Sequence, residues 1–164
     1  MREVAAAASV SVGTVSNVLN APDKVAPATV ARVHAAIDQL GFVRNDAARQ
    51  LKAGRSRSVG LIVLDIGNPF FTDVARAAEH RAAQHNLTLL LGTSDDSPRR
   101  ERTYIDAFEE QRVFGLLVSP IGEDLGRLIT LQQRGTAVVL VDRDGTGTPF
   151  DSVAVDDVAG AALA

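Results

Sequence analysis

From residue 58 onward, short apolar runs alternate with amphipathic stretches of helical length. Apolar runs without polar alternation are typical of strands buried on both faces, and repeated strand–helix alternation predicts a parallel sheet with helices on both sides. This part of the chain is therefore expected to be an α/β lobe. The expected strands are residues 59–64, 87–91, 114–118, 137–141 and 153–155, and the expected helices are residues 69–85, 98–111 and 123–134.

The first forty residues have apolar positions spaced three and four apart instead. This spacing predicts helices over residues 2–8, within residues 9–20 and over residues 27–40. Pro27 suits the first position of the last helix, and Gly41 is placed to end it. Three short helices with one apolar face each can build a small all-α core. The apolar positions of the last helix are Val30, Val33, Ile37 and Leu40.

The segment 9–20 has a distinctive outer face. Its small polar start predicts a turn, and Ser11 can cap the following helix by accepting a hydrogen bond from a free backbone N–H. At about 100° per residue, Val15, Val18 and Leu19 point inward, whereas Gly13, Ser16 and Asn17 point outward and Val12 lies at the margin. A short helix with a small polar front can approach another molecule closely, and the major groove of DNA is the obvious candidate. An ordinary solvated helix face is the alternative.

Residues 44–57 join the two parts and allow two interpretations. Their Arg-, Ser- and Gly-rich end is typical of a basic, flexible linker. Alternatively, Asn45 or Asp46 could cap a helix of about two turns that ends at Gly54, with residues 47, 48 and 51 on one face. A helix of that length is marginal in water, so it would need a stabilising partner.

Charge is segregated along the chain. Residues 1–57 contain eight Lys/Arg and four Asp/Glu, a net +4, whereas residues 58–164 contain nine and sixteen, a net −7; the two sum to the overall −3. A basic first third suits contact with phosphates, and an acidic remainder would be repelled by DNA. Chance clustering of solvated charge is the competing explanation.

Several classes of protein are disfavoured. The chain has no cysteine, which excludes disulfide scaffolds, cysteine-based zinc sites and thiol catalysis. It has no signal-like apolar segment and no apolar run of membrane-spanning length, so we expect no membrane partner and a cytoplasmic location. No phosphate-binding glycine motif follows a strand, so no nucleotide cofactor is expected. No nucleophile and base converge, and we expect neither catalytic residues nor a metal; aspartates at strand ends more often cap the next helix.

Several motifs of the first third of the chain form a recognisable set: Glu3-Val4-Ala5, Ala8, Val10-Ser11, Thr14-Val15-Ser16, Val18-Leu19-Asn20 and Leu40-Gly41-Phe42. Together they resemble the lactose/galactose repressor (LacI/GalR) family of bacterial transcription regulators, in register across residues 3–54. Two positions depart from the family pattern. Ser9 stands in the turn where glycine is usual, which predicts a slightly strained or differently shaped turn, and Asn17 stands where arginine is frequent.

The resemblance implies a set of DNA contacts. It places Val12, Gly13, Ser16 and Asn17 against base edges, with Thr14 helping to hold the backbone. Ser11 is also among the expected DNA-binding residues. The segment 44–57 is similar to the family's hinge helix, which pairs with its copy in a dimer and lies in the minor groove. Leu51 would then wedge between base pairs. Asn45, Arg49 and Lys52 complete the expected DNA-binding residues of this segment.

The α/β part also resembles the family, whose regulatory region looks like a periplasmic sugar-binding protein. The resemblance rests on Asn68-Pro69-Phe70-Phe71 and on the segment 155–160, where Asp157 departs from the usual Asn. The implied effector-binding residues are Asn68, Phe70, Phe71, Asp142 and Asp156. For Phe71 the alternative is core packing, because it also fits an inward helical stripe.

These observations predict a helix-turn-helix head at 1–43, a hinge at 44–57 and a first regulatory lobe at 58–164. The resemblance implies a homodimeric repressor that binds a near-palindromic operator in double-stranded DNA and responds to a sugar-like small-molecule effector. Family members run to about twice this length, so we expect a truncated lobe that exposes apolar surface and cannot close on an effector. The alternatives are a periplasmic-type sugar-binding protein and a fragment of an α/β enzyme.

Overall fold

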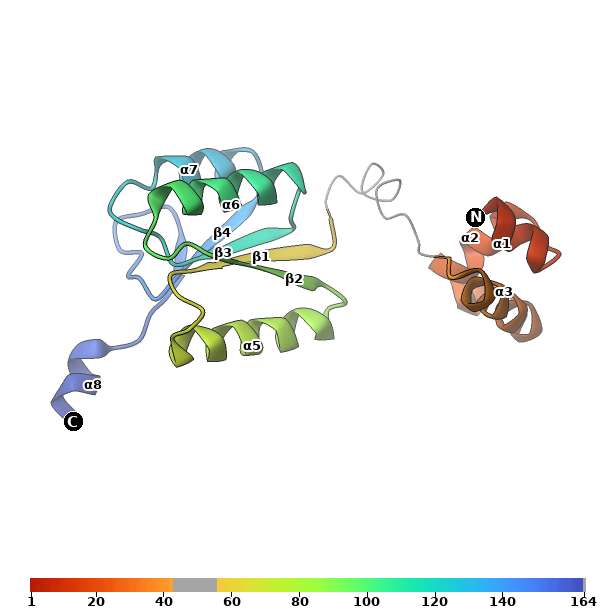
Figure 1. The fold of residues 1–164 in the computed structure, drawn as a ribbon, viewed down its shortest axis with the longest axis horizontal. Coiled ribbons are helices and arrows are strands. Elements are labelled where there is room, and N and C mark those ends of the chain that lie inside the picture. Colours follow the sequence, from red (N-terminus) through yellow and green to blue (C-terminus); the bar gives the residue numbers. More distant parts are fainter. Residues whose placement is uncertain (43–55, 164) are drawn as a thin grey trace. The chain divides into compact units, whose positions relative to one another are not determined.

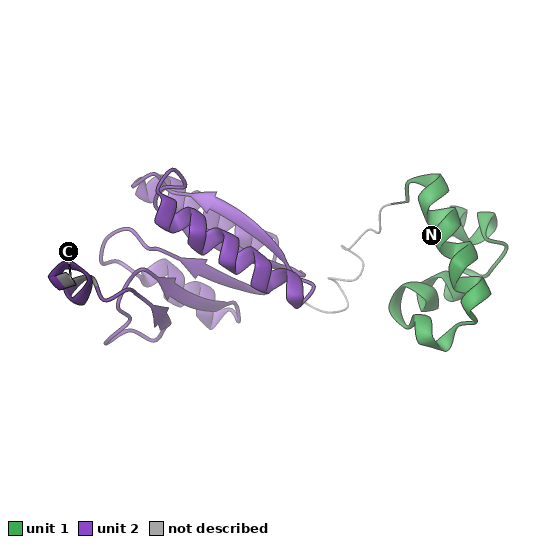
Figure 2. Cartoon of the chain, turned by 90° about the horizontal axis from the view of Figure 1, so that it is seen from below, with its two compact units in different colours: residues 1–46 green, residues 47–164 purple. Residues whose placement is uncertain are grey.

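The computed structural model describes residues 1–42 and 56–163. The chain divides into two compact units, residues 1–46 and residues 47–164 (Figure 2). Each unit has its own hydrophobic core, and each is described separately below.

The smaller unit is all-α, as the spacing of apolar residues predicts. It contains α1 (Arg2–Ala7), α2 (Val12–Asn20), the 3₁₀ turn η1 (Pro22–Lys24) and α3 (Pro27–Leu40). Pro27 occupies the first turn of α3, and Gly41 ends that helix with a φ of 55°. Leu40 was expected on the inner face but is 44% exposed, because it is the last residue before this left-handed stop. The core residues are Val4, Ala5, Ala8, Val15, Val18, Val33 and Ala36.

The larger unit is built on a five-stranded sheet in which every paired strand runs parallel to its neighbour. The strand order is β2-β1-β3-β4-β5, so β1 is flanked by the two strands that follow it in sequence. The strands are β1 (Ser58–Val63), β2 (Thr88–Thr93), β3 (Gly115–Val118), β4 (Ala137–Val141) and β5 (Asp151–Val153), and the helices are α5 (Pro69–Gln84), α6 (Pro98–Glu110), α7 (Gly126–Gln133) and α8 (Asp157–Leu163).

Helices cover both faces of this sheet. Figure 1 shows α5 on one face and α6 and α7 on the other. Alternate residues of β1 serve the two layers: Leu61 and Val63 pack in the cluster that includes α5, whereas Ile62 packs in the cluster that includes α6 and α7. All three are fully buried, as expected for a central strand covered on both faces. The predicted α/β lobe is confirmed.

Two glycines let α6 lie close to the sheet. A Cβ at Gly60 in β1 would lie 2.5 Å from a ring carbon of Phe108, and one at Gly92 in β2 would lie 2.7 Å from the ring of Tyr104. Both contacts are shorter than any side chain allows, so these positions require glycine unless the rings move. The close approach fixes α6, and with it the first turn of α6, relative to the strand ends.

The two outermost strands, β2 and β5, differ most from expectation. The first of them was expected at residues 87–91 but is Thr88–Thr93. The last strand was expected at residues 153–155 but is Asp151–Val153, and all three of its residues are exposed. An edge strand with polar residues lacks the apolar run by which the inner strands are recognised.

The helices within the described ranges are too short or too polar to cross a membrane.

Candidate nucleic-acid interface and effector cleft

The turn between α1 and α2 has the strain that its serine predicts. Ser9 has a φ of 52°, in the left-handed region where glycine is favoured. The turn is closed by backbone hydrogen bonds: the Ser9 N–H donates to the Ala6 carbonyl at 3.1 Å and the Val10 N–H to the Ala5 carbonyl at 2.9 Å. The chain therefore keeps the turn conformation without the glycine.

The start of α2 is capped as the sequence indicates. The Oγ of Ser11 accepts a hydrogen bond from the Thr14 backbone N–H at 3.0 Å. The Thr14 hydroxyl lies 2.9 Å from the same oxygen. This pair fixes the first turn of α2 and engages both hydroxyls locally, which suits residues near a DNA backbone better than residues that read bases.

The outer face of α2 is small and open to solvent. Val12 is 43% exposed, and Gly13 and Asn17 are also exposed. The Oγ of Ser16 lies 3.2 Å from the Asn20 side-chain nitrogen, which also donates to the Ser16 carbonyl at 2.8 Å. Within the described ranges, the Asn17 amide forms no hydrogen bond with another side chain. Asn17 is thus the residue on this face best placed to offer a paired donor and acceptor.

Four of the expected DNA-binding residues lie outside the described residues. They are Asn45, Arg49, Leu51 and Lys52. Their contacts with DNA stay predictions.

The larger unit has an open cleft at the carboxyl ends of its strands. Its volume is about 480 Å³. This is the edge at which parallel α/β sheets bind ligands. One lining residue, Ser119, is 2% exposed, and its Oγ has no hydrogen-bond partner among the described residues. The lining residues are Leu64, Ser119, Pro120, Glu123, Asp142, Arg143 and Asp144.

One wall of the cleft is held by an arginine from a neighbouring loop. Arg143, just after β4, donates from Nη2 to the Glu123 carboxylate at 2.7 Å and from Nη1 to the Gly122 carbonyl. These contacts join the loop after β3 to the loop after β4. Because two donors of one planar guanidinium are used, the orientation of the loop is fixed as well as its position.

The same loop is also held by α6. The Oε2 of Glu101, in the first turn of α6, accepts a hydrogen bond from the Ile121 N–H at 2.8 Å. Partial burial raises the pKa of the Glu101 carboxyl above its usual value, although the Ile121 hydrogen bond and the charge of Arg143 oppose this rise. Glu101 and Arg143 therefore act together to position the cleft wall.

The two phenylalanines after β1 have different environments. Phe71 is 4% exposed and packs with Leu61, Val63 and Ala75 in the core, which supports the core-packing interpretation. Phe70 is half-buried and packs edge-on against Phe71, with ring centroids 5.1 Å apart. Phe71 is therefore a core residue, whereas Phe70 keeps part of its ring open to solvent; neither lines the cleft.

Two of the three polar residues that were expected to bind an effector accept hydrogen bonds from backbone N–H groups at the start of a helix. The side-chain oxygen of Asn68 accepts from the Phe70 N–H at 3.0 Å and caps α5. Asp156 accepts from the Ala159 N–H at 2.9 Å. Asp142 has a φ of 56° and lines the cleft. Of the five expected effector-binding residues, the structure places Asp142 in the cleft wall.

Sequence reasoning missed Glu101 and did not select Ser119 or Arg143. Glu101 lies within a charged helical stretch where nothing distinguishes it from its neighbours. Ser119 and Arg143 do follow predicted strands, and position at a strand end was the available signal. The contacts that Glu101 and Arg143 make with the loop after β3 join the start of α6 and the loop after β4 to it, and these three segments are far apart in sequence.

The chain matches two family models and several known proteins. The model "Bacterial regulatory proteins, lacI family" matches residues 1–45, and "Periplasmic binding proteins and sugar binding domain of LacI family" matches residues 56–162. The chain is 36% identical to the HTH-type transcriptional regulator PtxS of Pseudomonas plecoglossicida over 94% of its length and 46% of the relative's. It is 37% identical to the ribose operon repressor of Bacillus subtilis over its whole length and 49% of that protein.

A solved structure agrees with these matches. A LacI-family transcriptional regulator from Silicibacter pomeroyi superposes with a TM-score of 0.80 at 30% identity, over 94% of this chain and 46% of that one. The chain thus spans about half the length of the relatives it matches. The second family model alone covers well over half of the chain, and the first covers the helical unit. The chain therefore belongs to the lacI family of bacterial regulatory proteins.

Proposed function

We propose that this chain provides the DNA-binding head and one effector-binding lobe of a homodimeric transcriptional repressor. The observation that carries the proposal is the outer face of α2, which is capped at Ser11, backed by its own small core and open at Asn17. The same chain continues into a lobe with an open cleft at its strand ends. The HTH-type regulator and the ribose operon repressor among its relatives support this assignment.

In the proposed complex, α2 enters the major groove of double-stranded DNA. Val12, Gly13, Ser16 and Asn17 face base edges, and Asn17 pairs with the N6 and N7 atoms of adenine. Ser11 and Thr14 hold the helix start beside the backbone. A dimer presents two such helices to a near-palindromic operator.

We further propose that the segment 44–57 forms the hinge. Leu51 wedges into the minor groove, with Arg49 and Lys52 on phosphates and Asn45 at the start of the segment. The domain bounds in this proposal are 1–43, 44–57 and 58–164. Because two hinges must be held together, a ligand bound to the lobe can change DNA affinity.

The effector is proposed to be a sugar-like small molecule bound at the strand ends. Asp142 offers a carboxylate, and Ser119 offers a hydroxyl that has no hydrogen-bond partner among the described residues. Asn68 and Phe70 come from the start of α5, and Asp156 comes from the segment after β5. Phe71 supports Phe70 from the core. We infer that the chain acts by binding rather than by catalysis, in the cytoplasm where the DNA lies; a periplasmic-type binding protein or an α/β enzyme would leave the helical head without a role.

The proposal is tested by selecting binding sites for the full chain from a random duplex library and titrating the result at several salt concentrations. A palindromic consensus, with affinity that falls steeply as salt rises, supports it. Recovery of no preferred sequence would contradict it. Addition of a panel of pentoses, hexoses and nucleosides to the selected complex then tests effector control, because an effector must change the affinity for DNA.

A further inference from the structure

Gly13 is a helical glycine that the packing of its own unit does not require. It is exposed, and among the described residues a Cβ built on it would meet only the Oγ of Ser11, at an ordinary van der Waals distance of 3.5 Å. Gly41, by contrast, has a φ of 55°, where other residues are strained. A glycine in a helix is less stable than an alanine, because it loses more backbone freedom on folding. The presence of glycine at position 13 therefore has a cause other than folding.

Val12, the residue before it, exposes an apolar side chain at the start of α2. It is 43% exposed and does not belong to the core of the helical unit. The first turn of a helix favours Asp or Glu, yet the first turn of α2 contains neither. A single exposed valine is ordinary by itself. This one stands beside a glycine that folding does not require, on the face that is proposed to meet DNA.

The hydroxyl groups around these two residues are engaged in local contacts. The Oγ of Ser11 accepts a hydrogen bond from the Thr14 N–H at 3.0 Å. The Oγ of Ser16 lies 3.2 Å from the side-chain nitrogen of Asn20. The first turn of α2 therefore presents mainly an apolar side chain and, at Gly13, an open space.

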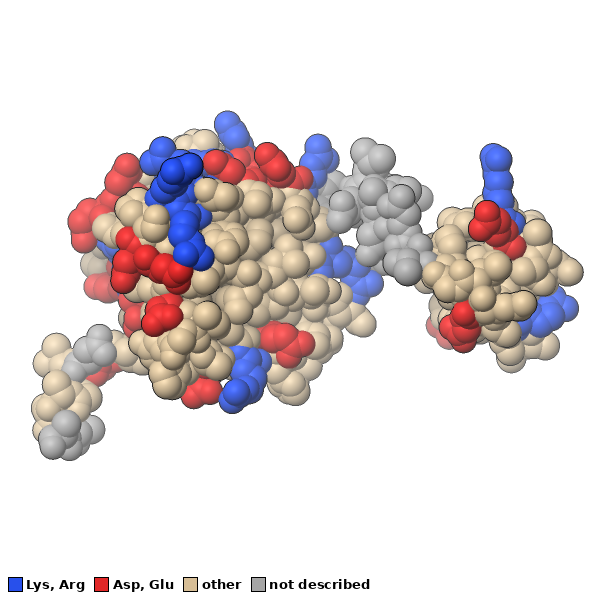
Figure 3. All heavy atoms as spheres, viewed as in Figure 1, with Lys and Arg blue, Asp and Glu red and all other residues tan. Residues whose placement is uncertain are grey.

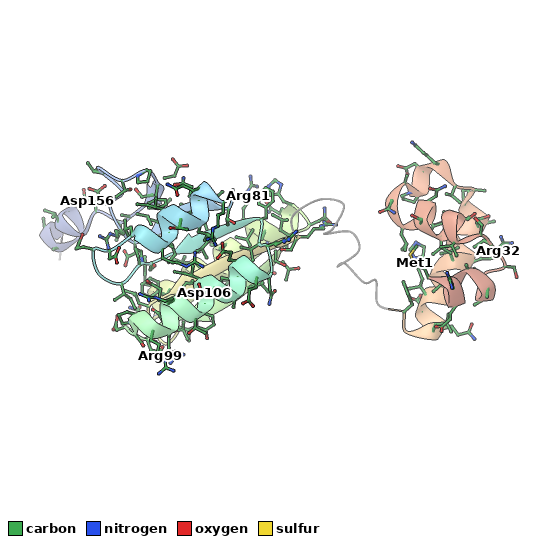
Figure 4. The ribbon with its side chains drawn as sticks, turned by 90° about the horizontal axis from the view of Figure 1, so that it is seen from above. Met1, Arg32, Arg81, Arg99, Asp106 and Asp156 are labelled. Atoms are coloured by element: carbon green, nitrogen blue, oxygen red, sulfur yellow. The ribbon has the colours of Figure 1, made fainter. Side chains whose placement is uncertain are left out.

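The charged side chains of the helical unit lie outside α2. Figure 3 shows that most of the visible surface of this unit is uncharged. Figure 4 labels one charged residue, Arg32, whose side chain projects from α3 into solvent. If phosphates are attracted by the flanking cations, α2 itself has to recognise bases by shape and by neutral groups. The charged residues of the described helical unit are Arg2, Glu3, Asp23, Lys24, Arg32 and Asp38.

The major groove offers one apolar group to such a surface. Among the four standard bases, thymine alone carries a methyl group there, at C5. The first residues of a recognition helix are the ones that contact base edges, and Val12 and Gly13 hold that position in α2. Val12 and Asn17 are five residues apart, which is about 7.5 Å along a helix axis or about two base-pair steps.

We propose that the missing side chain at Gly13 lets the first turn of α2 approach the base pairs closely, so that Val12 reads the 5-methyl group of a thymine. This thymine lies about two base pairs from the adenine assigned to Asn17. The inference rests on the proposed function, since it needs α2 in the major groove of a specific site. It adds a second base and the chemical group by which that base is recognised.

The test replaces each thymine of the selected operator, one at a time, with deoxyuridine, which removes only the 5-methyl group. Binding of the full wild-type chain should weaken about fourfold at one position of each half-site, as expected for one buried methyl group. In Val12→Ala the same replacement should have no effect, because the valine methyl groups that meet the thymine are gone. Leu40→Ala is the matched control: Leu40 is 44% exposed at the end of α3, and this variant should keep the full effect of the replacement.

Gly13→Ala tests the close approach separately. Its urea unfolding midpoint should be at least as high as that of the wild type, because alanine favours the helix. Binding to the operator should nevertheless weaken, and the response to thymine replacement should disappear, while binding to mixed-sequence DNA changes little. A variant that is no less stable than the wild type cannot lose operator binding through misfolding.

The outcomes separate the inference from the proposed function. A palindromic consensus whose binding is indifferent to every thymine replacement, or an effect that persists in Val12→Ala, would overturn the inference and leave the function intact. Wild-type operator binding by Gly13→Ala would do the same, as would a lower unfolding midpoint, which would show that the fold itself requires the glycine. Recovery of no preferred sequence would overturn both.

Discussion

The Oγ of Ser11 accepts a hydrogen bond from the backbone N–H of Thr14 at 3.0 Å and lies 2.9 Å from the Thr14 hydroxyl. This one oxygen satisfies an N–H that the first turn of α2 would otherwise leave without a partner. It also sets the angle at which the chain turns from Ser9 into the helix. The proposed reading face, one to six residues further on, is positioned by this contact.

Ser11→Ala is expected to destabilise the helical unit by about 1 kcal/mol, because the capping oxygen is removed. Ser11→Asp keeps a capping oxygen and suits the positive end of the helix, so stability should be retained. The added negative charge should nevertheless weaken DNA binding through phosphate repulsion. Chemical unfolding and DNA titration on the same variants separate the two effects; equal DNA affinity for wild type and Ser11→Asp would argue that α2 does not approach the phosphates.

An ion-pair network between α6 and α7 predicts a pH dependence of stability. Glu109 accepts hydrogen bonds from Arg127 and from Arg134, and these bonds lower the pKa of its carboxyl below the ordinary 4.5. A lowered folded-state pKa stabilises the fold above the ordinary value, and that stabilisation disappears as the pH falls through the folded-state pKa.

Glu109→Gln should therefore destabilise the lobe at neutral pH. The difference from wild type should shrink as the pH falls below 4.5. Thermal unfolding across pH measures this difference. Glu110→Gln is the matched control, because Glu110 is exposed and forms no ion pair within the described ranges; the same pH-dependent loss in both variants would show that net charge, not the network, is responsible.

The two phenylalanines after β1 should respond differently to truncation. Phe71→Ala removes a ring that is 4% exposed and is expected to cost about 3–5 kcal/mol of lobe stability. Phe70→Ala should cost less, because that ring is only half-buried. Urea unfolding of the full chain compares them. A larger loss for Phe70→Ala would show that the core is packed differently from this description.

Leu51→Ala tests the proposed hinge. If Leu51 wedges between base pairs, its removal should weaken binding to a selected operator much more than binding to mixed-sequence DNA, since only the bent complex uses the wedge. Competition titrations with both duplexes provide the measurement. Equal losses on the two would indicate that residues 44–57 act only as a basic tether.

Local sequence patterns predicted the elements whose signals are short-range. Pro27 and Gly41 bound α3, Ser11 caps α2, and the apolar runs of β1, β3 and β4 lie within a residue or two of the observed strands. The positive φ of Ser9 agrees with the strained turn that the family resemblance implied at this position. Each of these features depends on neighbours that are only a few residues away in sequence.

Features that depend on tertiary contacts were not predictable in this way. β5 is recognised by pairing with β4, where Val139 is aligned with Asp151, and not by an apolar run. The clamp of Glu101 and Arg143 on the loop after β3 joins residues about twenty positions apart on either side. The role of Gly60 becomes clear only when Phe108 is placed against it.

The central claim is that α2 reads DNA through Asn17, and parallel site selection with the wild-type chain, Asn17→Ala and Asn17→Arg tests it most directly. The account predicts a palindromic consensus for wild type with adenine at one position of each half-site. Asn17→Ala should lose the preference at that position alone, and Asn17→Arg should shift it to guanine, since arginine pairs with the O6 and N7 atoms of guanine. One unchanged consensus for all three proteins would contradict the claim.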